Sequence, residues 1–341
     1  MMKVFFTAEA NEEVVSKLRE HFDIEFDGWN IGGDVFSEEE LIQKLEDVDI
    51  FVTSYDKVTS KVIESSKNLK LIGCTRSNPV NINLDACKRN GVQVFNTPGR
   101  NSDVTAEFAV GMLLNISRNI TLANRHIVDG AVIQDETPTE MKKDVTWGLV
   151  KNNRPYNMFK GPQIKNKNVG IIGYGSIGKR VADIMTGFGA NILVYDPYKN
   201  RLDVENPSTK LVDLEELIEK SDYISCHTKI TPETEGLFNK ETFKKMKNNA
   251  FLINNSRGAI INEGDLHEAL KNGEIAGAAL DVFGYEPLYK EHLFIKEPLD
   301  NLLLTPHISG ASDDSIINGT KLLVDELINY KKNGNLLFKV V

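Results

Sequence analysis

The sequence predicts an α/β protein with two doubly wound parallel-sheet domains, and three observations lead to this prediction. The chain has 341 residues, and a domain usually holds about 100 to 200, so two domains are expected. Hydrophobic residues make up 41% and charged residues 26%, which is typical of a globular protein and not of a disordered or fibrous one. Strand-like runs alternate twice with helix-like segments, and such alternation indicates parallel strands joined by helical crossovers.

The first alternation occupies the N-terminal part of the chain. Its strand-like runs are short and rich in β-branched or aromatic residues, and its helical segments have apolar residues at helical spacing, as Val14, Val15 and Leu18 do. The predicted strands are 4–7, 50–53, 69–74 and 92–95. The predicted helices are 12–21, 61–67 and 84–90, the last of which is stopped by Gly91.

A long helix is then predicted over 102–128, with Asn101 or Ser102 as its N-cap. Its apolar residues are too many for one buried stripe, so we expect it to pack against its symmetry mate in a homodimer. The connection over 130–161 has little periodicity and contains several prolines, glycines and basic residues. A connection of this length is usually either a linker or a functional surface loop.

The second alternation starts at Val169 and predicts another doubly wound sheet. Its predicted strands are 169–172, 192–195, 223–226, 251–253, 278–282 and 302–304. Its predicted helices are 177–188, 214–220, 240–247 and 263–272. A final helix is predicted over 312–330, where apolar residues again recur at helical spacing.

Composition and charge argue against several classes of partner. The net charge of -9 repels phosphate backbones and anionic lipid, so we expect neither nucleic acid nor a membrane surface as a partner. The three cysteines are odd in number and form no C-x-x-C pair, so neither a disulfide framework nor a metal site is expected. Together with the absence of a secretory pattern or a long apolar stretch, this favours a cytoplasmic protein.

Glycines follow the first strand of the second alternation in the pattern G-x-G-x-x-G. Gly173 permits a tight turn, Gly175 lets the backbone approach a pyrophosphate, and Gly178 lets helix and strand pack closely. The amides that would face the phosphates belong to Ser176 and Ile177. The alternative is that these glycines serve only the turn and the packing of the helix.

Asp196 supports the reading of these glycines as a dinucleotide-binding Rossmann motif. It lies 18 residues after Gly178, at the end of the next predicted strand, where a carboxylate can accept hydrogen bonds from the hydroxyls of the adenosine ribose. A carboxylate at this place would also repel a ribose phosphate, so NAD is favoured over NADP as the cofactor.

Three ionisable residues follow predicted strands farther along the chain, where ligands bind in open α/β sheets. These residues are Arg257, Glu286 and His307, and each of them alone could be an ordinary surface or loop residue. Together they carry what carbonyl reduction needs. An arginine binds a carboxylate in bidentate fashion, an imidazolium protonates a developing alkoxide, and a carboxylate orients the imidazole and favours its protonated form.

The sequence resembles the D-isomer-specific 2-hydroxyacid dehydrogenase family, and the resemblance spans nearly the whole chain. The matching stretches are 96–99, 169–178, 195–197, 231–234, 255–258, 279–283, 286–287 and 305–310. The family implies a flavodoxin-like substrate domain made of 1–102 and 311–341, a Rossmann NAD-binding domain over 103–310, and an active site in the cleft between them. It also implies that the reaction interconverts a 2-keto acid and a D-2-hydroxy acid.

The resemblance assigns a role to individual residues. It implies that Arg257 binds the substrate carboxylate, that His307 is the acid/base, and that Glu286 is the partner of His307. Asp281 resembles the residue that holds the nicotinamide amide, and Thr228 resembles a residue that borders the cofactor. The expected cofactor contacts also include Ser256 and Gly310.

The chain departs from the family in the substrate loop. Where the family has glycines that offer backbone amides, this sequence has Arg76, Ser77 and Asn78, so we expect these three residues to contact the substrate. The identity of the 2-hydroxy acid stays open. The alternatives are a phosphoglycerate dehydrogenase of the short type, and an NAD-sensing corepressor-like binding protein with the same fold.

Overall fold

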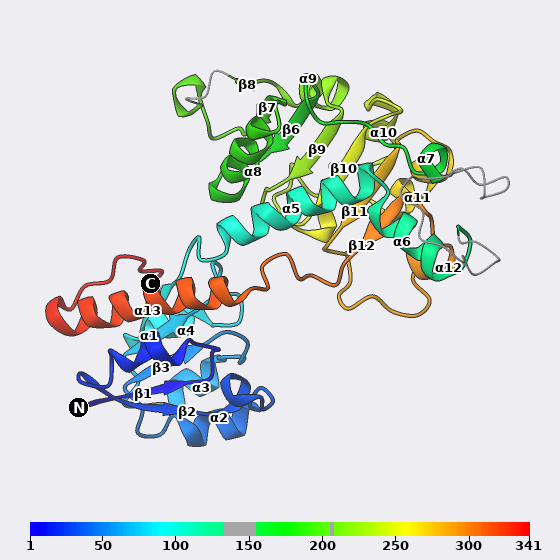
Figure 1. Cartoon of the computed structure of the whole chain (residues 1–341). Coiled ribbons are helices and arrows are strands. Elements are labelled where there is room, and N and C mark those ends of the chain that lie inside the picture. The colour runs from blue at the N-terminus through cyan, green and yellow to red at the C-terminus, as the bar shows by residue number, and fades with distance from the viewer. Residues whose placement is uncertain (133–154, 205–207) are drawn as a thin grey trace, which may run out of the picture. The chain divides into compact units, whose positions relative to one another are not determined.

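The computed structural model describes residues 1–132, 155–204 and 208–341, which divide into two compact units (Figure 1). Unit 1 consists of Met1–Val104 and Ala311–Val341, and unit 2 consists of Thr105–Gly310. The sequence places the domain boundaries after residues 102 and 310, and the structure divides the chain after residues 104 and 310. Unit 1 is therefore built from both ends of the chain.

Unit 1 contains a five-stranded parallel sheet in the order β2-β1-β3-β4-β5. Its strands are β1 (Met2–Phe6), β2 (Phe22–Phe26), β3 (Ile50–Thr53), β4 (Leu71–Cys74) and β5 (Gln93–Asn96). In the register of the sheet, Val4 lies opposite Ile50, and Ile50 lies opposite Leu71. This is the flavodoxin-like strand order, and its switch point lies between β1 and β3.

Helices cover both faces of the unit 1 sheet. They are α1 (Glu12–Ser16), η1 (Gly28–Ile31), α2 (Glu38–Lys44), α3 (Ser60–Ser65), α4 (Leu84–Asn90) and α13 (Asp313–Asn333). Successive strand residues point to opposite faces, so Phe5 and Phe51 enter one apolar cluster while Val4 and Val52 enter the other. The second cluster also contains Leu323, Val324 and Leu327 of α13, which lies beside α1 (Figure 1).

Unit 2 contains a seven-stranded parallel sheet within the described residues, in the order β12-β11-β10-β9-β6-β7-β8. Its strands are β6 (Asn168–Ile172), β7 (Asn191–Tyr195), β8 (Thr209–Leu211), β9 (Tyr223–Cys226), β10 (Phe251–Asn254), β11 (Gly277–Leu280) and β12 (Leu302–Leu304). The strand order reverses between β6 and β9, as it does in a Rossmann fold.

Two apolar clusters also flank the unit 2 sheet. The helices between residues 102 and 310, within the described part of the chain, are α5 (Ser102–Ser117), α6 (Ile120–Val128), α7 (Pro155–Met158), α8 (Ser176–Gly187), η3 (Arg201–Asp203), α9 (Leu214–Lys220), α10 (Lys240–Lys245), η4 (Gly258–Ile260), α11 (Glu263–Lys271) and α12 (Leu293–Lys296). Helices α5 and α8 contribute to the cluster that contains Ile171 and Ile253, and α9, α10 and α11 contribute to the cluster that contains Ile172 and Leu252. None of the described helices is long and apolar enough to cross a membrane.

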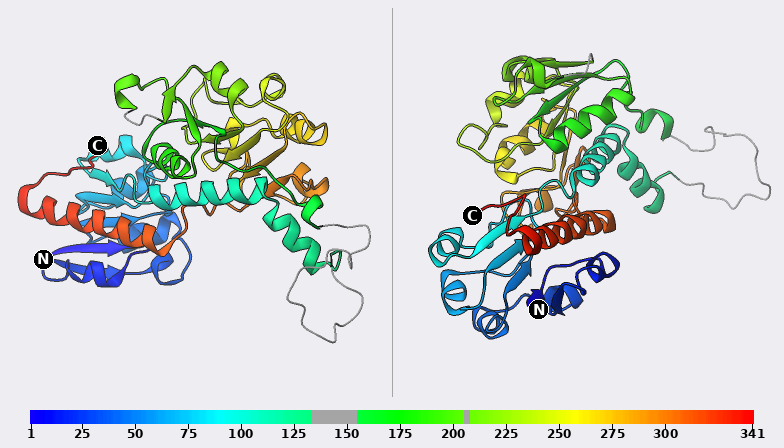
Figure 2. Two further views of the ribbon diagram at one scale, coloured as in Figure 1. Left: turned by 45° about the horizontal axis from the view of Figure 1, so that its top comes forward. Right: turned by 90° about the vertical axis from the view of Figure 1, so that its left-hand side faces the viewer.

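The long helix predicted over 102–128 is two helices, because Asn119 adopts a left-handed conformation with φ 54° (Figure 2). The apolar side chains of α5, including Ala106, Leu113 and Ile116, are buried in the core of unit 2. These residues are therefore used inside unit 2, and the packing of this helix against a symmetry mate stays a prediction. Exposed apolar side chains occur instead on α6, where Val128 is 76% exposed.

Candidate active site

The glycine-rich turn after β6 lies at the switch point of unit 2. Gly173 has φ +91°, and a Cβ atom there would lie 2.6 Å from the carbonyl oxygen of His227. A Cβ atom on Gly178 would lie 2.0 Å from the carbonyl oxygen of Gly173. Around Gly175, in contrast, no described residue outside its chain neighbours and the backbone of α8 has an atom within 4 Å of where a Cβ would be. The first and third glycines are therefore required by packing, and the second leaves open space beside the backbone.

This open space fits the pyrophosphate of a dinucleotide. Gly175 is the N-cap of α8, and because glycine has no side chain it does not itself occupy the space before the N-terminal end of the helix dipole. Ser176 and Ile177 form the first turn of α8. Thr228 follows β9 on the other side of the switch point, where its hydroxyl donates to the carbonyl of Lys229 at 3.3 Å.

Asp196 follows β7 and holds this turn. Its Oδ2 accepts the backbone N–H of Tyr174 at 2.8 Å, and its Oδ1 accepts the backbone N–H of Tyr198 at 2.9 Å. A carboxylate has about four lone-pair positions, so about two remain for the hydroxyls of a ribose. The residues around the turn therefore suit NAD as the cofactor.

Changing Asp196 to Ala should narrow the preference for NADH over NADPH by about tenfold or more, which is about 1.4 kcal/mol. The reason is that the variant loses the charge that repels a 2'-phosphate. Both cofactors should bind less tightly, because the turn at Tyr174 loses a hydrogen bond. The ratio of kcat/KM for the two cofactors isolates the charge effect, and Asp183→Ala on the exposed side of α8 is the matched control. An unchanged ratio in the Asp196 variant would remove Asp196 from cofactor selection.

His307 and Glu286, which are 21 residues apart in sequence, form a pair in unit 2. The distance from His307 Nδ1 to Glu286 Oε2 is 2.5 Å. The other carboxylate oxygen, Oε1, accepts the backbone N–H of Phe283 at 2.9 Å. The His307 side chain is 50% exposed and that of Glu286 is 32% exposed, so the pair is accessible to a small molecule. With Nδ1 facing Glu286, Nε2 is the nitrogen left for a substrate.

Asp281 holds the loop that carries His307. Its Oδ1 accepts the hydroxyl of Thr305 at 2.6 Å and the N–H of Ile308 at 2.9 Å, and its Oδ2 accepts the N–H of Ser309 at 2.8 Å. Asp281 is completely buried, and within this loop His307 has φ 55°. Since three of about four lone-pair positions are occupied, only one remains for the expected contact with a nicotinamide amide.

Arg257 follows β10, which is the neighbour of β11 in the sheet. Its side chain is exposed, and Nη1 donates to the carbonyl of Ser256 at 2.5 Å. Asn254 stabilises the turn by donating to the carbonyl of Arg257 at 2.9 Å and by accepting from the hydroxyl of Ser256 at 2.9 Å. The turn therefore presents the guanidinium at the same edge of the sheet as His307. Gly310, the remaining expected cofactor contact, is the last residue of unit 2.

Two supporting residues were not predicted as part of the site. A Cβ atom on Gly258 would lie 1.9 Å from the carbonyl carbon of Phe283, so only glycine lets the Arg257 turn pack on the loop that carries Glu286. Glu263 accepts the N–H of Gly284 at 3.0 Å and pairs with His292 at 3.1 Å, which fixes the same loop. The position of Gly258 directly after Arg257 was a sequence signal that could have indicated its role. No local sequence pattern indicates the role of Glu263.

The three expected substrate residues lie in unit 1, after β4. The guanidinium carbon of Arg76 lies 5.5 Å from the ring centre of Tyr55. Ser77 and Asn78 are exposed, and the carbonyl of Ser77 accepts the side-chain amide of Asn96 at 2.6 Å. Most of the basic residues of the connection over 130–161 lie outside the described residues, and the prediction that this connection is a linker or a functional surface loop therefore stays a prediction.

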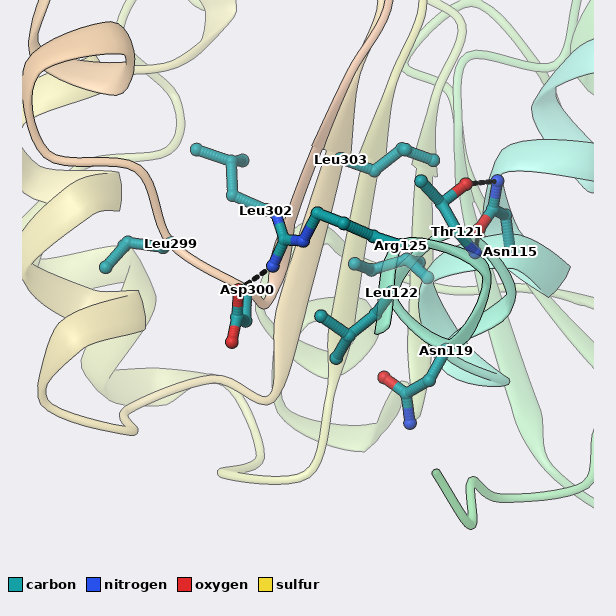
Figure 3. Close-up of a pocket in the computed structure, with 10 residues that line it drawn as sticks. Asn115, Asn119, Thr121, Leu122, Arg125, Leu299, Asp300, Leu302 and Leu303 are labelled. Carbon is teal, nitrogen blue, oxygen red and sulfur yellow. Dashed lines mark hydrogen bonds and ion pairs between the residues drawn. The ribbon is translucent and has the colours of Figure 1, made fainter. Parts of the chain in front are cut away.

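A small pocket of about 60 Å³ lies elsewhere in unit 2 (Figure 3). Its polar lining includes Arg125 of α6, which points to Asp300 and pairs with it, and Asn115, which donates to Thr121 at 2.8 Å. Asp300 and Leu302 stand at the amino-terminal end of β12, whereas His307 follows its carboxyl end. Ligands of such sheets bind outside the carboxyl ends, so this pocket is separate from the candidate active site.

The fold and the site of unit 2 define a dinucleotide-binding oxidoreductase unit. A family model described as "D-isomer specific 2-hydroxyacid dehydrogenase, NAD binding domain" matches residues 110–309. The chain belongs to this family, and it is an NAD-dependent dehydrogenase.

Individual relatives have different substrates in their names. The chain is 35% identical over 332 residues to a glyoxylate reductase of Thermococcus litoralis, covering 97% of this chain and 94% of that protein. It is 34% identical over 333 residues to a D-3-phosphoglycerate dehydrogenase of Archaeoglobus fulgidus. That match covers 97% of this chain but only 58% of the other protein. Among solved structures, the apo-structure of D-lactate dehydrogenase from Escherichia coli matches with a TM-score of 0.78 at 25% identity, with both chains fully covered.

Proposed function

We propose that the enzyme interconverts a 2-keto acid and a D-2-hydroxy acid, with His307 as the acid/base, Glu286 as its partner and Arg257 as the ligand of the substrate carboxylate. The observation that carries this proposal is the 2.5 Å contact between His307 and Glu286 in the unit that also holds the glycine turn. In this proposal unit 2 binds NAD, and unit 1 is the substrate domain.

Each residue then has one chemical task. Bound NAD supplies or accepts the hydride. Arg257 orients the substrate by binding its carboxylate through two parallel N–H groups. Nε2 of His307 donates a proton to the carbonyl oxygen during reduction and takes it back during oxidation. Glu286 stabilises the imidazolium through its negative charge and keeps Nδ1 turned away from the substrate. Asp281 keeps His307 in place through the loop.

Oxidation of NADH in the presence of a panel of 2-keto acids tests this proposal. The panel includes glyoxylate, pyruvate and 3-phosphohydroxypyruvate, because the names of the relatives point to both small and phosphorylated substrates. We expect turnover of at least one of them, with a D-2-hydroxy acid as product. Binding of NADH without turnover of any keto acid would contradict the proposal and favour a corepressor-like binding protein.

We also propose that the enzyme is a cytoplasmic homodimer. The three cysteines are unpaired and buried, which suits a reducing compartment. Exposed apolar residues on α6, among them Ile120 and Ile127, would be covered in a dimer. A monomeric mass by sedimentation at micromolar concentration would contradict the dimer.

A further inference from the structure

The loop that carries Glu286 joins β11 to α12 in unit 2. Residues 281–292, all of which the structure describes, form no helix or strand. The carboxylate of Glu286 nevertheless lies 2.5 Å from Nδ1 of His307, and its other oxygen accepts the N–H of Phe283. Because Phe283 belongs to the same loop, this second contact does not fix the loop to the rest of unit 2. The aim of Glu286 at His307 therefore depends on contacts that hold the loop from outside.

Glu263, the first residue of α11, makes such contacts at two places in the loop. Its Oε1 accepts the N–H of Gly284 at 3.0 Å, and its Oε2 lies 3.1 Å from Nε2 of His292. Gly284 lies two residues before Glu286, and His292 lies six residues after it. The N-terminal end of a helix also favours a negative charge at this position. One carboxylate on a helix thus holds the loop on both sides of Glu286.

The ring of His292 is fixed in orientation and in the position of its proton. Nδ1 accepts the N–H of Phe294 at 3.3 Å as the N-cap contact of α12, so the ring proton is assigned to Nε2, which donates to Glu263. The side chain is only 6% exposed, and the rings of Tyr289 and Phe294 meet it edge-on, with 5.3 and 5.0 Å between the ring centres. His292 therefore presents a fixed donor to Oε2 of Glu263.

The other end of α12 is also attached to α11. Nε2 of the buried His267 lies 2.9 Å from the carbonyl oxygen of Glu297, the C-cap residue of α12, to which it donates. The ring of His267 stacks on Phe294 with 6.4 Å between the ring centres. Since α12 is held against α11 at both ends, the loop that carries Glu286 ends on a fixed support.

The contact of Glu263 with Gly284 lies beside the residue that holds Glu286. Phe283 precedes Gly284, and its N–H is the one that Glu286 Oε1 accepts. Phe283 also packs on the turn that carries Arg257, because a Cβ atom on Gly258 would lie 1.9 Å from the carbonyl carbon of Phe283. A shift of the backbone at Gly284 would therefore move the support of Glu286.

We propose that Glu263, held by His292, is a positioning residue for the acid/base pair. It fixes the backbone at Phe283 and Gly284 so that the carboxylate of Glu286 stays on Nδ1 of His307. This role rests on the proposed function, in which Glu286 is the partner of His307. The task requires a carboxylate, because both oxygens face donors and an amide would direct an NH₂ group at one of them.

The kinetics of Glu263→Gln test the effect on the reaction. We expect kcat to fall by about 10- to 100-fold, because a small misplacement of a catalytic group has a cost of this order. The Kd for NADH should change little, because the glycine turn follows β6. Glu268→Gln makes the same chemical change at an exposed position of the same helix and should leave kcat unchanged.

The same substitution in a Glu286→Gln background distinguishes positioning from a general loss of structure. If Glu263 acts through Glu286, Glu263→Gln has little further effect on kcat once the charge of Glu286 is gone. A role in stability alone would lower kcat by the same factor in both backgrounds.

Hydrogen–deuterium exchange measures the position of the loop without any turnover. In Glu263→Gln the backbone amides of residues 283–286 should exchange about tenfold faster or more, whereas those of α8 should not change. His292→Asn should raise exchange at the same amides, because asparagine can still cap α12 but is too short to reach Glu263. This second variant keeps the test available if Glu263→Gln does not fold.

The outcomes separate this proposal from the proposed function. Faster exchange confined to residues 283–286, together with an effect on kcat that disappears in the Glu286→Gln background, would support the positioning role. Unchanged exchange at these residues, a uniform increase throughout unit 2, or equal loss of kcat in both backgrounds would overturn it. If no keto acid is turned over, the proposed reaction fails, and exchange alone decides whether Glu263 positions the loop.

Discussion

Changing His307 to Gln should lower kcat for keto-acid reduction by a factor on the order of 10² to 10⁴, the usual contribution of a positioned general acid. The glutamine side chain is similar in length, but its amide does not act as an acid or a base, so it cannot donate a proton to the substrate and take it back as an imidazole does. Binding of NADH should change little, because the glycine turn and Asp196 lie on other strands of the sheet. Steady-state kinetics and a fluorescence titration with NADH measure the two quantities separately.

The partner role of Glu286 is tested by a double-mutant cycle with the same substitution at both residues. Glu286→Gln retains an acceptor for the N–H of Phe283 but removes the charge next to Nδ1 of His307. If the pair acts as a unit, Glu286→Gln lowers kcat in the wild type and has little further effect in His307→Gln. Glu291→Gln, exposed in the same loop, is the matched control. Independent, multiplicative effects of the two substitutions would refute the partner role.

The central strands could be predicted closely because buried parallel strands are short apolar runs with turn residues at both ends. The predicted strands 50–53 and 223–226 coincide with β3 and β9, which lie inside their sheets. Edge strands are less apolar, and β2 was missed because Asp23 and Glu25 alternate with its apolar residues. That alternation is itself a strand signal.

Helix α2 was also missed although its start is encoded locally. Ser37 accepts the N–H of Glu40, and the carboxylate of Glu40 accepts the N–H of Ser37, which together form a capping box. The break between α5 and α6 has no comparable signal. It depends on a distant segment, since a Cβ atom on Gly161 would lie 1.8 Å from the carbonyl oxygen of Ser117, and Asn119 donates to the carbonyl of Phe159 at 3.4 Å.

The location of the candidate site could be predicted from one rule, that ligands of parallel sheets bind at the carboxyl ends of strands. This rule selects Asp196, Arg257 and His307 without knowledge of any contact. The residues that support the site could not be found in this way, because their partners are distant in sequence. Glu263 is an example, because its partners Gly284 and His292 follow it by 21 and 29 residues.

Asp281 is the clearest example of such support, and Asp281→Asn should lower both stability and activity. Asparagine keeps one oxygen, which can still accept from Thr305 and Ile308, but it directs an NH₂ group at the N–H of Ser309. Two donors then face each other in a completely buried place. Hydrogen bonds to charged groups contribute about 1.5 to 3 kcal/mol each, so we expect a loss of about 3 kcal/mol.

For a unit of this size such a loss lowers the Tm by about 6 to 12 °C. We also expect kcat to fall at temperatures where the variant is fully folded, because His307 is held at φ 55° by the loop that Asp281 anchors. Asp300→Asn is the matched control. It changes the same residue type in the same unit, but Asp300 is an exposed partner of Arg125, so its loss should cost at most about 1 kcal/mol. Similar Tm values for the two variants would show that Asp281 does not anchor the loop, and a lower Tm with unchanged kcat would show that the anchoring serves stability alone.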